Sequence, residues 1–146
     1  AFGVQAIIFI TLIQYGSLIK IEENIIQVLP ICLFWGRFSI LIYLEKFNYL
    51  CYERKSTSHK EYWRGFKKES ILSLGILSLI IFYYLFPFTS TFSIIQSTFL
   101  IVSGLLCSYK VPTLLGKSIG GVNGDTCGAS IVLTETLMIL IHAIVL

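Results

Sequence analysis

The sequence predicts an all-α membrane protein that crosses the bilayer about five times. Two observations predict this class. Of the 146 residues, 55% are hydrophobic and only 13% are charged, a balance that is unusual for soluble domains. The chain also contains five apolar stretches of roughly membrane-spanning length, and lipid offers no hydrogen-bond partner to unpaired backbone groups outside helices. We expect one transmembrane domain over residues 1–146, with a glycine-rich loop before the last helix.

The first two apolar stretches are separated by a short charged segment. Residues 2–19 form the first expected helix, which the run KIEEN closes. The second expected helix covers residues 25–44 and carries Pro30 and the charged Arg37. Phe and Tyr are plentiful near the ends of the apolar runs, where aromatic rings favour the lipid headgroup level.

The last three helices surround the polar part of the chain. The third expected helix, residues 71–87, begins after a charged group that ends at Glu69 and stops at Pro87. The fourth, residues 92–108, precedes the glycine-rich loop, and the fifth runs from about residue 129 to residue 146.

The basic residues predict the orientation in the membrane. With five helices, the 45–70 loop and the 109–128 loop lie on the same side, and together they hold nine Lys and Arg residues against Lys20 alone on the other side. Such a bias marks the cytoplasmic side, so we expect a multi-pass protein of the cell (inner or plasma) membrane with a cytoplasmic glycine-rich loop. The basic 45–70 loop is either a solvated segment near anionic lipid or a phosphate-gripping element.

We interpret the four cysteines as reduced thiols, because they form no CxxC pair and no Cys/His cluster at zinc spacing; they are Cys32, Cys51, Cys107 and Cys127. His59 and His142 have no partner at metal spacing and receive no role. The chain begins within an apolar segment, which does not have the features of a signal peptide.

The loop GKSIGGVNGDTCGA is rich in glycine and contains one carboxylate, Asp125. Glycines let a backbone approach an anion closely, and the following helix N-terminus favours negative charge, although neither GxxxxGK[ST] nor GxGxxG occurs. Asp125 would repel phosphate unless a cation lay between them, and Mg²⁺ commonly binds one or two carboxylates plus substrate phosphates. The loop is thus either a metal and phosphate site with Asp125 as a metal ligand or a simple turn with Asp125 as helix N-cap.

Glu135 follows Asp125 on the same face of the last helix, about 15 Å further along at 1.5 Å per residue. The two carboxylates are too far apart to ligate one ion directly. Glu135 falls near the middle of the bilayer, where a charge costs roughly 2.5 to 3.5 kcal/mol. We therefore expect Glu135 to be protonated, to be paired with a cation, or to face a polar cavity. The alternative is a neutral structural side chain that is hydrogen-bonded to Thr134, Thr136 or a neighbouring helix.

Arg37 is a candidate partner for Glu135, because both lie at a similar depth, about 10 Å from the cytoplasmic end. We hypothesise that they face a shared interior cavity, where Arg37 pairs with Glu135 or reaches a substrate phosphate. Snorkelling of Arg37 to the headgroups is the alternative.

The segment IGGVNGDTCGASIVLTETL closely resembles the C-terminal signature GG-x-TGD-x-x-GA-x-x-x-x-x-x-E of the cobalamin synthases, the adenosylcobinamide-GDP ribazoletransferases. The segment AFGVQAIIFITLIQYGSLIKI is similar to the stretch after the family's acidic N-terminal region, and WGRFSILIYLEKFNYL resembles its GR-containing helix. The resemblance covers most of the chain in the right order, although residues 45–107 match only by pattern.

The resemblance implies a polytopic membrane enzyme that requires Mg²⁺ and two substrates, adenosylcobinamide-GDP and α-ribazole or its 5′-phosphate. A ribose hydroxyl attacks the corrinoid-linked phosphate and displaces GMP. Carried onto this chain, the catalytic candidates are Asp125, Glu135 and Arg37, with Asp125 as the metal ligand. The other motif and loop positions are candidates for substrate and phosphate binding; they are Gly120, Gly121, Asn123, Gly124, Gly128 and Lys117, with Ala129 as a further motif position.

Two departures from the family pattern qualify these expectations. Asn123 stands where the family usually has Thr; Asn can still form hydrogen bonds but has no hydroxyl. The family's aspartate-rich motifs around a DG pair are absent, and we expect a C-terminal fragment that is inactive alone.

Two other classes remain open as alternatives. CDP-alcohol phosphotransferases catalyse a related reaction, but their signature DG-x-x-AR is missing. A transporter or channel subunit would use the loop as a re-entrant segment and Glu135 in an ion path. We expect a lipid bilayer as partner and no nucleic acid, and a homo-oligomer stays open.

Overall fold

The computed structural model of the chain describes residues 2–50, 65–85 and 94–145, with backbone alone at residues 2, 80–85 and 94. Expectations for Cys51, His59, Pro87 and much of the basic loop lie outside the described residues. The described chain is helical, which confirms the predicted class, and its elements are α1 (Phe2–Lys20), a short 3₁₀ turn η1 (Glu22–Asn24), α2 (Ile25–Lys46), α3 (Phe66–Leu85), α4 (Ile94–Ile119) and α5 (Gly124–Val145).

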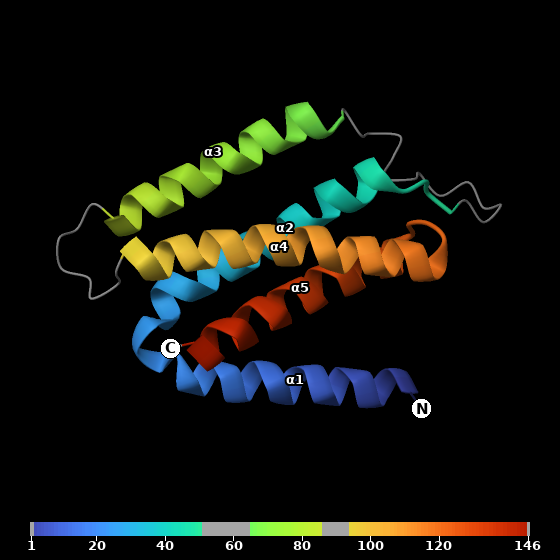
Figure 1. Ribbon diagram of the computed structural model, residues 1–146. Coiled ribbons are helices and arrows are strands. Elements are labelled where there is room, and N and C mark those ends of the chain that lie inside the picture. Colours follow the sequence, from blue (N-terminus) through green and yellow to red (C-terminus); the bar gives the residue numbers. More distant parts are fainter. Residues whose placement is uncertain (1, 51–64, 86–93, 146) are drawn as a thin grey trace.

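The helices form an elongated bundle around α2. Helix α2 packs against α3, α4 and α5, and α5 also packs against α1 and α4. Successive helices reverse direction, so the N-terminus, the end of α2, the start of α3 and the turn between α4 and α5 lie at one end (Figure 1). This end carries the glycine-rich segment, as the sequence predicts.

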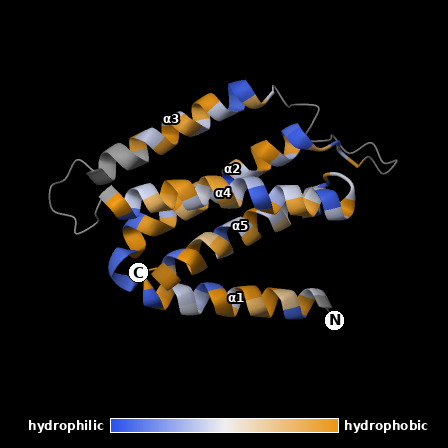
Figure 2. Cartoon of the chain, in the orientation of Figure 1, coloured by the Kyte–Doolittle hydropathy of each residue, from blue (hydrophilic) through white to orange (hydrophobic). Residues whose placement is uncertain are grey.

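Four of the helices within the described residues are long and apolar enough to cross a membrane, namely α1, α2, α4 and α5. Helix α3 contains most of the third predicted stretch but begins earlier, with Lys67, Lys68 and Glu69 in its first turn. Apolar residues run along the helices, while hydrophilic residues gather near their ends (Figure 2). The distribution suits a multi-pass membrane protein.

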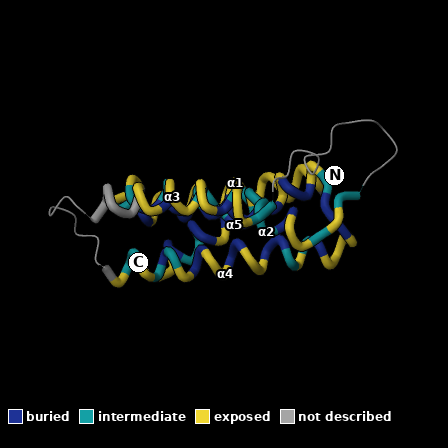
Figure 3. Tube along the Cα trace, turned by 90° about the horizontal axis from the view of Figure 1, so that it is seen from above, coloured by how far each residue is buried: buried dark blue, intermediate teal, exposed yellow. Residues whose placement is uncertain are grey.

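Helices α2, α4 and α5 supply most of the buried residues of the interior. Trp35 and Leu100 are among its fully buried side chains, and Cys32, Cys107 and Cys127 are buried free thiols, as predicted for these three. Buried residues face the inside of the bundle and exposed residues its outer surface (Figure 3). Much of that outer surface is apolar, which suits contact with lipid.

The predicted loop over residues 109–128 is wrong, because the connection between α4 and α5 is much shorter. Helix α4 continues through Pro112 to Ile119, and α5 begins at Gly124 rather than near residue 129, so only residues 120–123 connect the two helices. Proline is tolerated inside membrane helices because neighbouring groups and local adjustments satisfy the freed carbonyl. Consequently Lys110 and Lys117 lie on α4 instead of in a loop.

Candidate functional site

The turn between α4 and α5 is held against the chain that follows α2. Gly120 has a φ of +82°, a conformation that favours glycine. The backbone N–H of Val122 donates to the carbonyl of Asn48 (2.9 Å), and the N–H of Leu50 donates to the carbonyl of Val122 (2.7 Å). A side chain at Gly121 would lie 2.8 Å from the Asn48 carbonyl oxygen. The turn thus needs glycine for its own packing.

Tyr43 fixes this turn to α2. Its hydroxyl donates to the carbonyl of Gly121 (3.1 Å), and the side chain is fully buried. The ring packs edge-on against Phe47. The sequence alone does not distinguish Tyr43, because a Tyr near the end of an apolar run is ordinary in membrane helices.

Asn123, and not Asp125, caps α5. The Asn123 side-chain carbonyl accepts from the N–H of Thr126 (2.8 Å), and the Thr126 hydroxyl accepts from the N–H of Asn123 (2.9 Å). This reciprocal pair is a capping box. The N-cap alternative for Asp125 is therefore wrong, and the position where the family usually has Thr is filled by a side chain that also caps helices well.

Asp125 lies exposed in the first turn of α5. Within the described residues, the N–H groups of Gly124 and Asp125 have no hydrogen-bond acceptor. A Cβ added at Gly124 or Gly128 would meet no atom within 4 Å, so this face of α5 is open. Lys117 and Ala129 are exposed as well. The helix N-terminus can accept an anion, because its first N–H groups are free.

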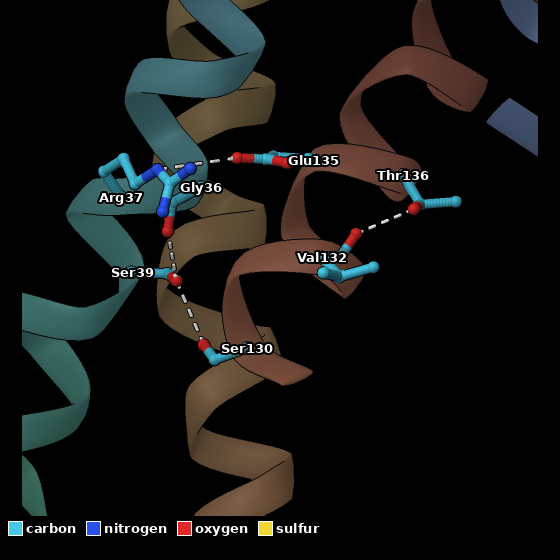
Figure 4. A network of polar contacts seen from close by, with 7 residues as sticks. All are labelled: Gly36, Arg37, Ser39, Ser130, Val132, Glu135 and Thr136. Atoms are coloured by element: carbon cyan, nitrogen blue, oxygen red, sulfur yellow. Dashed lines mark hydrogen bonds and ion pairs between the residues drawn. The ribbon is translucent and has the colours of Figure 1, made fainter. Parts of the chain in front are cut away.

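Arg37 and Glu135 meet where α2 faces α5 (Figure 4). The Nε of Arg37 lies 4.0 Å from the Oε1 of Glu135. The Arg37 side chain is 70% exposed and that of Glu135 only 13%. Because the two side chains approach each other this closely, the residues lie at a similar depth in the bundle. The pairing hypothesised from the sequence is therefore present.

The Glu135 carboxylate is held by few contacts. Its Oε1 is buried and has no hydrogen-bond partner in the described part of the chain. Thr136, an alternative partner, instead donates to the carbonyl of Val132 (2.7 Å) and accepts from the Gln14 amide of α1 (2.8 Å). Thr134 makes no hydrogen bond through its hydroxyl within the described residues. Bonding of Glu135 to its neighbouring threonines, the alternative kept open above, is absent.

Small residues let α2 and α5 approach closely beside this pair. Ser39 donates to the carbonyl of Gly36 (2.7 Å) and lies 3.0 Å from the Ser130 hydroxyl. Because Ser39 has a single hydroxyl proton, Ser130 is the donor in the second bond. The sequence carries a signal for this contact that was not used above: Gly36 and Ser39 are three residues apart and share a helix face.

An open pocket of about 450 Å³ lies between α2 and α3 beside Arg37. Its walls are mainly apolar; they comprise Pro30, Leu33, Phe34, Arg37, Phe38, Leu41, Ser73 and Ile76. Glu135 does not line it. The expectation that Arg37 and Glu135 share this cavity is therefore wrong, because Arg37 lines it from α2 and Glu135 lies on the α5 side of Arg37.

Two candidate sites thus lie along α5, and we call each of them a station and name it by its residues. The first is Asp125 at the turn, and the second is the Arg37–Glu135 pair, about 15 Å deeper along α5. Within residues 2–50, 65–85 and 94–145, no three Asp, Glu, His or Cys side chains gather closely enough to hold a metal together. Asp125 can therefore supply one carboxylate to a metal, and the remaining ligands must come from elsewhere.

These features define a helical multi-pass membrane protein with an exposed helix N-terminus at one end and an ion pair between two of its spans. The chain belongs to the cobalamin-5-phosphate synthase family, whose model matches residues 1–143. Family membership argues against the CDP-alcohol phosphotransferase and transporter alternatives.

Several curated relatives carry the name adenosylcobinamide-GDP ribazoletransferase. The chain is 38% identical to the protein of one Prochlorococcus marinus strain (SARG) over 147 aligned residues, and 32% identical to that of a second strain (MIT 9313) over 151. All of the chain is covered in both comparisons, and it spans 57% of each relative's length, in the C-terminal portion. A Synechococcus elongatus relative is 29% identical over 94% of the chain. No solved structure matches the chain.

Proposed function

We propose that this chain forms the C-terminal part of an adenosylcobinamide-GDP ribazoletransferase. The enzyme would transfer the adenosylcobinamide-phosphate group to α-ribazole or α-ribazole 5′-phosphate, and the product would be adenosylcobalamin or its 5′-phosphate, together with GMP. One observation carries the proposal beyond family membership. The GR segment of α2 and the signature segment of α5, which are far apart in sequence, come together at Arg37 and Glu135.

The Asp125 station suits the diphosphate of adenosylcobinamide-GDP. The free N–H groups of Gly124 and Asp125 can donate to phosphate oxygens at the positive end of the α5 dipole. Asp125 is a suitable ligand for Mg²⁺, which commonly combines one or two carboxylates with substrate phosphates. Such an ion would neutralise charge on the diphosphate. The exposed Lys117 near the end of α4 can add positive charge to the same end of the bundle.

The Arg37–Glu135 station suits a different part of the substrates, because it lies about 15 Å away along α5. The exposed guanidinium of Arg37 can bind a second phosphate, such as the 5′-phosphate of the acceptor nucleoside. The carboxylate of Glu135 would orient the guanidinium of Arg37 from the α5 side. The two stations would hold donor and acceptor so that a ribose hydroxyl faces the corrinoid-linked phosphorus.

In the reaction, the hydroxyl oxygen would form a bond to that phosphorus and release its proton to water, and the bond from phosphorus to the bridging oxygen of the guanylate would break. GMP leaves with the electron pair. Positioning and electrostatic stabilisation supply most of the catalysis in such transfers. The residues of this chain would act by binding and orienting, and not by forming a covalent intermediate.

We further propose that the end bearing the turn faces the cytoplasm of a cell (inner or plasma) membrane. Lys46 is in the last turn of α2, Lys67 and Lys68 are at the start of α3, and Lys117 is in the last turn of α4, so all four lie toward this end. The opposite end carries Lys20 beside Glu22 and Glu23. This asymmetry agrees with the positive-inside rule. In this orientation both substrates would reach the turn from the cytoplasm.

The test uses the longest natural protein that contains this chain, purified in lipid nanodiscs. Adenosylcobinamide-GDP and α-ribazole are added with Mg²⁺, and GMP and the cobalamin product are measured. We expect equal amounts of both products, and loss of turnover on chelation or in Asp125→Asn. The matched control is Glu69→Gln, which removes a carboxylate from the first turn of α3 and should retain turnover. Formation of neither product by the unaltered protein would refute the proposal.

A further inference from the structure

Gly36 precedes Arg37 in α2 and directly faces Glu135 of α5 (Figure 4). A Cβ built at Gly36 would lie 2.6 Å from the Oε1 and 2.9 Å from the Cδ of Glu135, with the Cγ closer still. These distances are shorter than any stable contact between such atoms. The space that a side chain at position 36 would take is therefore already occupied by the Glu135 side chain.

The three nearest atoms all belong to the side chain of Glu135, and none to the α5 backbone. Rotation of that side chain can relieve the overlap, whereas the helices can stay in place. Gly104 provides a contrast, because an added Cβ there would overlap the indole of Trp35, which is fully buried in the core. A substitution at Gly36 should thus displace one carboxylate, and a substitution at Gly104 should disturb the core.

The carboxylate of Glu135 has little else to keep it in position. Its Oε1 makes no hydrogen bond within the described residues, and its ion pair with Arg37 is long, at 4.0 Å. The Ser39 and Ser130 hydroxyls bridge α2 and α5 close by, so the helix spacing is set independently of Glu135. The position of the carboxylate then depends on the space that the absent side chain of Gly36 leaves for it.

We propose that Gly36 is a positioning residue, which provides the space that holds the Glu135 carboxylate against α2 and beside Arg37. Any larger residue pushes the carboxylate away from the guanidinium. Gly36 does not touch a substrate in this account; it acts through Glu135. Only the kinetic part of the inference rests on the proposed transferase function.

A double-mutant cycle in the full-length protein tests the proposal. The four proteins are the unaltered one, Gly36→Ala, Glu135→Ala and the double variant, and thermal unfolding is measured in the same nanodiscs. We expect Gly36→Ala to lower Tm when Glu135 is present and to leave it unchanged or raise it in the Glu135→Ala background, because Ala is the better helix former. The matched control is Gly75→Ala on α3, where an added Cβ meets nothing within 4 Å.

Turnover supplies the readout that a purely structural role would not give. We expect Gly36→Ala to lower kcat about 100-fold, the scale of a 1 Å misplacement, with little change in the KM of either substrate. The double variant should be no slower than Glu135→Ala alone. Gly75→Ala should retain kcat.

Two results would overturn the inference. One is a loss of Tm from Gly36→Ala that persists undiminished without Glu135, and the other is a multiplicative loss of kcat in the double variant. If Gly36→Ala fails to fold, recovery of folding in the double variant supports the proposal, and failure of both overturns it. If the unaltered protein releases no GMP, the proposed function fails, and the Tm cycle still decides the role of Gly36.

Discussion

Removal of the Tyr43 hydroxyl should loosen the turn that carries the Asp125 station. The buried hydroxyl donates to the Gly121 carbonyl at 3.1 Å. Tyr43→Phe keeps the ring and its edge-on contact with Phe47, so the substitution removes one hydrogen bond and leaves one buried carbonyl without that donor. A neutral hydrogen bond contributes about 1 kcal/mol, and an orphaned buried acceptor adds to the loss. We expect a loss of about 1 to 2 kcal/mol, which corresponds to a fall in Tm of about 2 to 8 °C for a protein of this size class.

The assay combines thermal unfolding with amide hydrogen exchange in nanodiscs. The N–H groups of Val122 and Leu50, which bond across the turn, should exchange faster in Tyr43→Phe while amides in the middle of α2 stay protected. Tyr15→Phe is the matched control, because Tyr15 is exposed on α1. Equal Tm and equal exchange in Tyr43→Phe and Tyr15→Phe would refute the reasoning.

Three further substitutions test other contacts by thermal unfolding. Asn123→Ala should lose about 1 kcal/mol by removing the α5 cap, whereas Asn123→Asp should retain most of it; equal losses would contradict the capping role. Gln14→Leu should cost about 0.6 kcal/mol, the average for hydrogen bonds between membrane helices, and should weaken the contact of α1 with α5; an unchanged Tm would show that the bond is dispensable. Gly104→Ala should cost about 1 to 3 kcal/mol by overpacking against Trp35, while Gly75→Ala should cost nothing; a tolerated Gly104→Ala would contradict the close packing of α2 on α4.

The fold class and the helix order could be predicted because apolar length and flanking charge follow directly from the bilayer. The end of α4 could not, since Pro112 and Gly116 read as loop signals in water. Inside the bundle, Pro112 is tolerated, and Gly116 is where α4 meets Phe47. Local propensity rules do not include such tertiary contacts.

The candidate site was predictable in part. Equal depth in two helices was sufficient to pair Arg37 with Glu135. Depth does not determine which faces of two helices meet, however, so the space at Gly36 and the Ser39–Ser130 bond required the structure. Asp125 rather than Asn123 was the candidate for the cap, as one of two alternatives, because a sequence places a helix start only to within a few residues.

The most direct test of the central claim is the rate of GMP release by the full-length protein and its Arg37→Gln variant, with adenosylcobinamide-GDP and α-ribazole 5′-phosphate at saturation. We expect the unaltered protein to release GMP in step with cobalamin 5′-phosphate. Arg37→Gln should lower the rate on the order of 100-fold or more, the scale of removing one preorganised donor. Full activity of Arg37→Gln would contradict the phosphate role of the α2–α5 site.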